Sequence, residues 1–174
     1  PPCSPDPPPP LAVVALAPRR HGALDSQEIL AFLRGDTPTV ASLTHIHHVY
    51  GNDIALAPLS ARTKTCLISL DATQSVGHIP VHVSRLPVDL LSFSAHKMFG
   101  LPGCGVLWIR GSTARALGVN VEHQLLQRCE QRSLNVPGIL ALDQAIELVE
   151  DIGPERISSC LLYTSPNPRD RTRS

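Results

Sequence analysis

Short apolar runs alternate with helix-like stretches through the middle of this 174-residue sequence. The runs are rich in valine, leucine and isoleucine, as expected of strands that are buried on both faces. Such strands need helices above and below the sheet. The alternation therefore predicts an α/β fold, with a mostly parallel sheet flanked by helices. The expected strands are residues 11–17, 39–44, 65–70, 88–93 and 105–109.

Helical signals lie between these runs. Asp25 and Glu28 form a D-x-x-E capping signal, and the apolar residues at 29, 30 and 33 then predict a short amphipathic helix. Residues 54–61 have room for one or two helical turns. A longer helix is expected after Pro137-Gly138, with one apolar stripe at i, i+3, i+7 and i+10. That stripe consists of Ile139, Leu142, Ile146 and Val149.

The two ends of the chain differ from the middle. Residues 1–10 are mostly proline, which we interpret as a flexible leader in preference to a docking motif. Residues 158–174 end in a polar, basic, proline-broken stretch, so we expect a non-native or disordered tail. Residues 11–157 then form one α/β domain.

Composition excludes several classes of partner. Fifteen basic and fifteen acidic side chains cancel, and only 3% of residues are aromatic, so neither nucleic acid nor a membrane surface is an expected partner. No apolar run is long enough to span a bilayer. The five cysteines form no CxxC pair, and their odd number indicates reduced thiols inside a cell. Cytoplasm, mitochondrion and plastid all stay open.

Polar side chains follow two of the predicted strands. Asp71 comes directly after residues 65–70, and Ser94, His96 and Lys97 follow residues 88–93. Asp71 and Lys97 are 26 positions apart, which corresponds to one strand-crossover-strand unit. Ligands of such folds bind beyond the carboxyl ends of the strands, so the acid and the amine are expected to face one crevice.

An acid and a lysine at one crevice suit pyridoxal phosphate. That cofactor needs an amine to hold it as a Schiff base, and a carboxylate to keep its pyridine nitrogen protonated. Ser94 and His96 are candidate donors to its phosphate, and Gln74 is close enough in sequence to reach its ring hydroxyl. Taken singly, an aspartate after a strand more often belongs to a turn or caps a helix, and a lysine is more often a surface charge.

Taken together, the residues resemble a known pattern. Residues 71–77 (DATQSVG), 88–97 (VDLLSFSAHK), 100–110 (GLPGCGVLWIR) and 135–139 (NVPGI) are similar to the cofactor-binding stretch of class V aminotransferases, and most of all to the cysteine desulfurases. The resemblance implies part of the large domain of a fold type I pyridoxal-phosphate enzyme. It also implies that Lys97 carries the cofactor, Asp71 pairs with its pyridinium, Gln74 contacts its ring hydroxyl, and Ser94 and His96 hold its phosphate.

Two positions depart from the family pattern. His48 stands where the family has an asparagine that contacts the cofactor ring, and it is a candidate replacement donor. A metal site in this histidine-rich segment (residues 45–48) is disfavoured, because no cysteine or carboxylate nearby completes a tetrahedral set. Ser133 takes the place of a threonine that reaches the partner subunit's cofactor phosphate, but Arg132 replaces the glycine before it.

The resemblance implies an enzyme that removes sulfur from L-cysteine, leaving alanine and an enzyme persulfide, for iron-sulfur cluster assembly. It further implies a homodimer, a sulfur-acceptor protein and no metal. Other class V activities, such as a transaminase or a selenocysteine lyase, and an inactive truncated chain stay open. The family's sulfur-accepting cysteine and substrate-binding arginine match no residue here, so we expect a fragment without activity on its own. Cys160 is too early to be that cysteine, and Cys104 is expected to be a small buried side chain.

Overall fold

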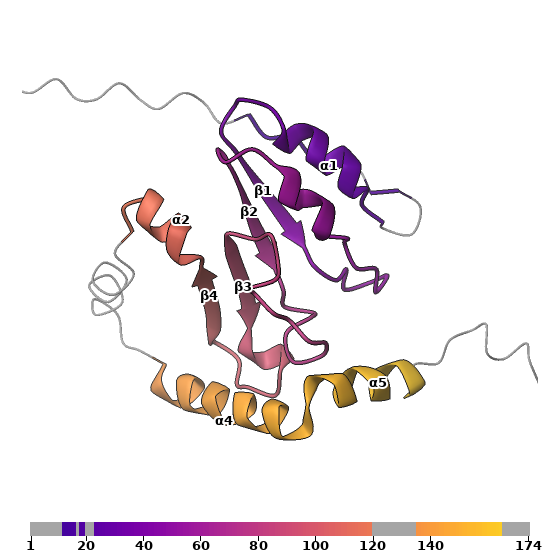
Figure 1. Cartoon of the computed structure of the whole chain (residues 1–174). Coiled ribbons are helices and arrows are strands. Elements are labelled where there is room, and N and C mark those ends of the chain that lie inside the picture. Colours follow the sequence, from indigo (N-terminus) through magenta and orange to yellow (C-terminus); the bar gives the residue numbers. More distant parts are fainter. Residues whose placement is uncertain (1–11, 17, 20–22, 120–134, 165–174) are drawn as a thin grey trace, which may run out of the picture.

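The computed structural model describes residues 12–16, 18–19, 23–119 and 135–164 (Figure 1). Its core is a four-stranded sheet with helices before, between and after the strands. The strands are β1 (Thr39–Thr44), β2 (Cys66–Asp71), β3 (Leu90–Ser94) and β4 (Gly105–Ile109). The helices are α1 (Ser26–Leu33), η2 (Ala57–Ala61), η3 (Ala95–Lys97), α2 (Gly111–Ala116), α4 (Val136–Ile152) and α5 (Pro154–Thr164).

The strands lie in sequence order, β1-β2-β3-β4. β1, β2 and β3 are parallel, and β4 runs antiparallel to β3. The register places Thr44 beside Asp71 and Asp71 beside Ser92, so the carboxyl ends of the three parallel strands lie at one edge. The prediction of a mostly parallel sheet flanked by helices is confirmed. Four of the five predicted strands are present within two residues of their expected bounds.

The main core lies on one face of the sheet. α1 begins at Asp25, whose side chain accepts a hydrogen bond from the amide of Gln27, as the capping signal predicted. Its apolar side packs over alternate residues of β1 and β2, with η2 beside it. The buried residues of this cluster include Ile29, Leu30, Leu33, Leu43, Leu59, Ile68, Leu70 and Leu91.

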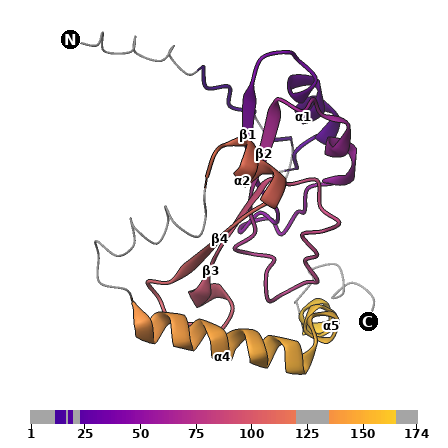
Figure 2. The same cartoon turned by 60° about the vertical axis from the view of Figure 1, so that its left-hand side comes forward.

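α4 covers the lower end of the same face, beneath β3 and β4 in Figures 1 and 2. The predicted stripe is only half right, because Ile139 is 47% exposed and Ile146 is 37% exposed. The helix instead buries Gly138, Leu142, Ala145 and Val149. Small residues on this side allow a close approach to the turn after β3, where Leu142 and Val149 meet Ala95 and Met98.

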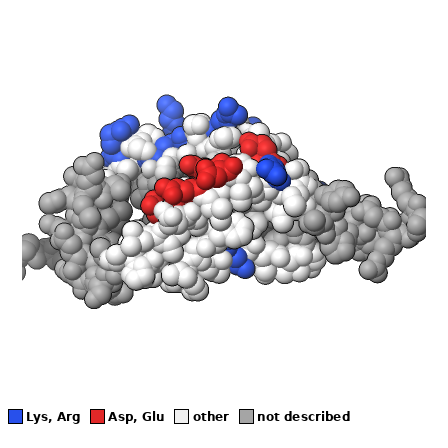
Figure 3. Space-filling model, turned by 90° about the horizontal axis from the view of Figure 1, so that it is seen from below, with Lys and Arg blue, Asp and Glu red and all other residues white. Residues whose placement is uncertain are grey.

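The solvent-facing side of α4 therefore carries both acidic and apolar residues. Figure 3 shows a band of acidic side chains across the underside of the molecule. The exposed acidic residues of α4 are Asp143, Glu147, Glu150 and Asp151. Exposed isoleucine and leucine residues lie among them. None of the helices in the described part of the chain is both long and apolar enough to cross a membrane.

The segment expected to be the first strand is not one. Residues 12–16 have no regular structure, Val13 is 90% exposed and Val14 is 62% exposed. A strand is stabilised by pairing with a neighbour, and no described strand pairs with the outer edge of β1. At the other end, α5 continues to Thr164 and so into the segment that the sequence assigned to the tail. Residues 165–174 lie outside the described part.

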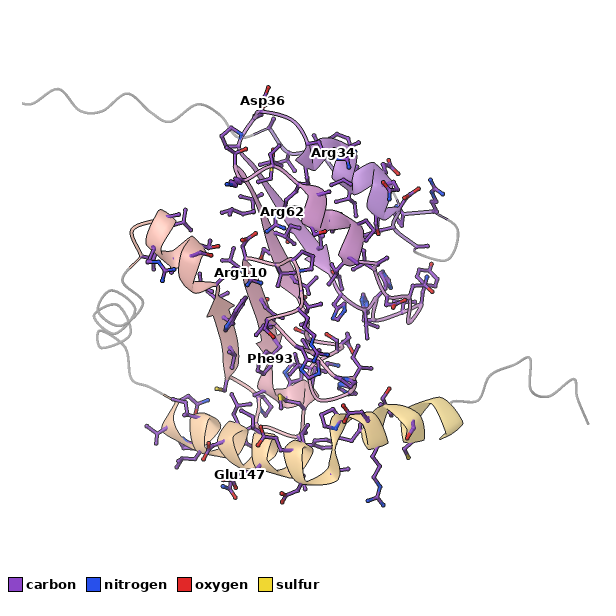
Figure 4. All side chains as sticks on the ribbon, viewed as in Figure 1. Arg34, Asp36, Arg62, Phe93, Arg110 and Glu147 are labelled. Carbon is purple, nitrogen blue, oxygen red and sulfur yellow. The ribbon has the colours of Figure 1, made fainter. Side chains whose placement is uncertain are left out.

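A polar network joins the amino-terminal ends of β2 and β3, opposite the edge at Asp71. Asp89 accepts hydrogen bonds from Arg62, from the amide of Ile68 and from the hydroxyl of Thr113. Arg110 donates to the carbonyls of Val83, Leu86 and Val88 and lies over the ring of Trp108. Figure 4 shows both arginines near the ends of the strands that lie away from α4. These contacts set the alignment of the strands whose far ends carry the candidate site.

Candidate functional site

The candidate residues lie at the carboxyl ends of two neighbouring parallel strands. Asp71 is the last residue of β2, Ser94 is the last residue of β3, and His96 and Lys97 follow at once in η3. Because Asp71 lies beside Ser92 in the sheet, the acid and the lysine segment occupy the same edge. This juxtaposition was predicted from the spacing and is confirmed.

The backbone around Asp71 is held on both sides. Its carbonyl accepts a hydrogen bond from the amide of His45 at 2.9 Å, and the amide of Ala72 donates to the carbonyl of Ser92 at 2.8 Å. The carboxylate accepts a hydrogen bond from the amide of Thr73 through one oxygen, Oδ1. The Asp71 residue is exposed, so its carboxylate can meet a ligand beyond the strand ends.

The turn after Asp71 packs tightly against the segment after Lys97. Gly77 has a φ of +81°, and a Cβ at this position would lie 2.7 Å from Cβ of Met98. Met98 is itself buried. Only glycine combines this backbone conformation with such a close approach. The acid-bearing turn and the lysine-bearing turn are thus fixed to each other by contact between residues 77 and 98.

The lysine segment also folds back on itself. The amide of Gly100 donates to the carbonyl of Ala95, and a Cβ on Gly100 would lie 2.9 Å from that carbonyl oxygen. The chain after Lys97 is thereby closed into a tight turn between residues 95 and 100. Ser94 Oγ and His96 Nδ1 share a hydrogen bond of 2.8 Å. Lys97 and His96 are exposed and Gln74 is half-buried.

The histidines of residues 45–48 have separate surroundings. His48 is exposed, and its ring stacks on that of His47 with centroids 5.0 Å apart. His45 instead points its Nδ1 at the hydroxyl of Ser75, at 2.8 Å. Burial lowers the pKa of His45 from its usual 6.5, against an opposing pull from Asp53. Among the described residues, no three histidine, cysteine or acidic side chains are grouped as metal ligands.

Sequence reasoning missed His45 and Ser75 as part of this site. Part of the signal was available, because Ser75 lies in the 71–77 stretch and His45 directly follows the end of β1. Their contact spans 30 residues of sequence, however, and no local pattern predicts it. Ser133 and its neighbour Arg132 lie outside the described residues.

One concave pocket, about 210 Å³ in volume, lies at the end of β1. Its walls include neither Asp71 nor Lys97, so this pocket is separate from the candidate site. Among the candidate residues, Asp71, His96 and Lys97 are exposed, whereas Gln74 and Ser94 are half-buried. The lining residues are Leu16, Pro18, Leu24, Thr44, His47, Asn52, Asp53 and Ile54.

Comparison with known proteins agrees with this arrangement. The sequence model of the family described as "Aminotransferase class-V" matches residues 10–161. The chain belongs to the class V aminotransferase family. The match includes both strand ends of the candidate site and the long helix α4.

Relatives within this family are cysteine desulfurases. The chain is 37% identical over 140 residues to "Cysteine desulfurase IscS" of Escherichia coli and, equally, of Shigella boydii. The matched region covers 79% of this chain but 33% of each relative. The chain therefore spans about a third of the length of the curated relatives that it matches.

Solved structures give the same fold. The apo structure of a cysteine desulfurase from Thermococcus onnurineus NA1 superposes with a TM-score of 0.67 at 26% identity, covering 80% of this chain and 39% of that one. The desulfurase CsdA of Escherichia coli superposes with a TM-score of 0.61 at 25% identity, over 77% and 39% of the two chains. A ureidoglycine-glyoxylate aminotransferase from Bacillus subtilis, at 17% identity, shares the fold alone.

The residues at this edge fit the cofactor of the family. Class V aminotransferases use pyridoxal phosphate, which requires an amine, a carboxylate and phosphate donors. The described chain presents an exposed amine at Lys97, an exposed carboxylate at Asp71 and a hydrogen-bonded Ser94–His96 pair on neighbouring strand ends. The two cysteines considered from the sequence lie elsewhere. Cys104 is half-buried against the cluster of Ala95, Met98, Leu142 and Val149. Cys160 is exposed on α5.

Proposed function

We propose that this chain is the cofactor-binding part of a pyridoxal-phosphate-dependent cysteine desulfurase. The observation that carries the proposal is the meeting of Asp71 with the Ser94–Lys97 segment at the ends of two paired parallel strands. The similarity to cysteine desulfurases over most of the chain supports the same reaction class. Because the chain spans about a third of those relatives, the reaction is proposed for a complete protein.

Each residue has a distinct role in the proposal. The Lys97 amine would hold the cofactor covalently, as a Schiff base that a substrate amine could displace. Asp71 would pair with the ring nitrogen, since its exposed carboxylate lies at the strand edge with one backbone donor. When bound, the cofactor supplies an electron sink for the carbon that loses sulfur.

The remaining residues orient the ligand. Gln74 donates to the ring hydroxyl from the turn after Asp71, and Ser94 and His96 hold the phosphate as a hydrogen-bonded pair. His48 is proposed as a donor to the ring, and Ser133 as a contact to the phosphate of a partner subunit. A homodimer would then complete each site.

The substrate of the complete protein is L-cysteine or a related amino acid. Its sulfur passes to a cysteine thiolate as a persulfide and alanine is released, after which an acceptor protein takes the sulfur. No cysteine of this chain is assigned to that step. We therefore expect the 174 residues alone to bind cofactor without completing the reaction.

Cofactor attachment can be tested directly. The chain is incubated with pyridoxal phosphate, reduced with borohydride, digested and mapped by mass spectrometry. The pyridoxyl group is expected on Lys97. Lys64, the other lysine of the sequence, serves as an internal control because it lies before β2, at the opposite edge of the sheet. Modification of Lys64 in preference to Lys97, or equal modification in a Lys97→Arg variant, would refute the assignment.

A further inference from the structure

A partly buried hydrogen-bond chain links the end of β1 to the turn that carries the candidate acid. His45 Nδ1 lies 2.8 Å from Ser75 Oγ, and Ser75 Oγ lies 3.0 Å from the carbonyl oxygen of Ala72. The Ser75 side chain is completely buried. No charge is needed to hold this chain together, since a hydroxyl and a neutral imidazole can satisfy every contact.

The geometry favours a proton on Nδ1 of His45. The Ser75 hydroxyl has a single hydrogen and is placed to donate it to the Ala72 carbonyl, which also accepts from the amides of Ser75 and Val76. With the hydrogen in that place, the contact between Ser75 and His45 is one in which His45 donates from Nδ1. Burial favours the neutral imidazole, whose pKa is lowered, so the neutral ring is held in its Nδ1–H tautomer.

His45 is itself anchored by its backbone. Its amide donates to the carbonyl of Asp71 at 2.9 Å, and its carbonyl accepts from the amide of Ile54 at 3.1 Å. The neighbouring residue Ile46 forms a bridge with Asp53. His45 thus contacts the acid-bearing turn at both its ends, through the backbone at Asp71 and through the side chain at Ser75.

We propose that His45 is a positioning residue for the cofactor site. Its Nδ1–H, acting through Ser75, fixes the 71–75 turn so that Asp71 and Gln74 present their side chains at the strand edge. Neither His45 nor Ser75 touches the cofactor in this scheme. The role in cofactor binding rests on the proposed function, whereas the hydrogen-bond chain itself does not.

Two substitutions of similar shape distinguish the effect of the Nδ1 donor from the effect of the size of the His45 ring. In His45→Asn the side-chain amide nitrogen is bonded to Cγ, as Nδ1 is, and keeps the donor, whereas His45→Leu has nearly the same shape without it. A lost hydrogen bond costs about 1 kcal/mol, equivalent to about five-fold in an equilibrium constant. We expect pyridoxal phosphate to bind about five-fold more weakly to His45→Leu, and to His45→Asn within about two-fold of the unchanged chain.

Two further readouts require no cofactor. Nitrogen NMR of the cofactor-free chain should find the proton of His45 on Nδ1. Amide hydrogen exchange of residues 72–76 should be faster in His45→Leu than in His45→Asn. Ser75→Ala removes the acceptor, so it should speed the same exchange, and adding His45→Leu to it should have little further effect. Ser75→Ala keeps the test decisive if His45→Leu does not fold.

Two outcomes would overturn the proposal. One is a His45 proton on Nε2 in the neutral ring. The other is equal exchange and equal cofactor affinity in His45→Leu and His45→Asn. If the unchanged chain fails to bind pyridoxal phosphate at Lys97, the proposed function is refuted instead. The tautomer and the exchange rates would then still decide whether His45 holds the turn.

Discussion

Replacing Asp89 with alanine removes a carboxylate that is bonded on three sides. Arg62 Nη2 lies 2.6 Å from Oδ2, the Ile68 amide lies 2.9 Å from the same oxygen, and the Thr113 hydroxyl lies 3.0 Å from Oδ1. The side chains of Arg62 and Asp89 are 15% and 8% exposed. The substitution therefore leaves a nearly buried guanidinium, an amide and a hydroxyl without this acceptor.

The structure indicates the size of the loss. Removing one partner of a buried ion pair costs about 3–5 kcal/mol, chiefly because the other charge stays buried and unpaired. Arg62 keeps hydrogen bonds to the carbonyls of Cys66 and Leu59, which partly compensate its charge. We therefore expect the lower end, about 3 kcal/mol, a large share of the roughly 5–15 kcal/mol that stabilises a typical domain.

The measurement is urea-induced unfolding of the cofactor-free chain, followed by far-ultraviolet circular dichroism. Arg19→Ala is the control, because it removes an ion pair with Asp25 in which Arg19 is 66% exposed, and about 1 kcal/mol or less should be lost. Replacing Arg62 and Asp89 together with leucine should recover much of the stability. The reasoning is wrong if Asp89→Ala costs no more than Arg19→Ala, or if the double substitution is as unstable as Asp89→Ala.

Three other changes test the site and its surroundings. Gly77→Ala should destabilise the chain by about 1–3 kcal/mol and weaken binding of pyridoxal phosphate, because the added Cβ meets Met98 at a left-handed backbone position. Gly51→Ala is its control, since Gly51 has a φ of +68° but open space around it, and equal losses in the two variants would argue against the contact with Met98. The pKa of His45 is lowered in the folded chain, so its contribution to stability is present above pH 6.5 and is lost as the pH falls through the folded value. The urea midpoint should therefore fall as the pH is lowered below 6.5, and by less in His45→Asn. An equal fall of the midpoint in that variant would contradict this assignment. Finally, sulfide release from L-cysteine by the 174-residue chain with cofactor and a reductant should not exceed that of Lys97→Ala, because the proposal assigns neither the sulfur-accepting thiolate nor the substrate-binding arginine to a residue of this chain. Turnover well above the control would identify one of its own cysteines as the sulfur acceptor.

Local sequence was sufficient for the strands that carry the site. Residues 39–44, 65–70, 88–93 and 105–109 are short apolar runs bounded by turn residues, and each became a strand close to the expected bounds. The acid and the lysine follow two of these runs directly. Because parallel neighbours end at one edge of a sheet, their meeting could be predicted from spacing alone.

Other features depended on contacts between distant segments. Residues 12–16 are as apolar as the true strands, but they have no described neighbour to pair with and remain irregular. In α4, large side chains at 139 and 146 suggested the buried stripe, yet the helix turned its small residues Gly138 and Ala145 inward to approach the turn after β3. Periodicity identifies an apolar helix, whereas the shape of the surface beneath it selects the buried side.

The same division holds for the chemistry. The order of Asp71 and Lys97 predicted a pyridoxal-phosphate site, since that cofactor needs a carboxylate and an amine. The resemblance to the family supplied the roles of Ser94 and His96. The link between His45 and Ser75 could not be predicted in this way. A histidine and a serine 30 positions apart carry no shared pattern, and they form a hydrogen bond only because β1 and β2 lie side by side and bury the space between their ends.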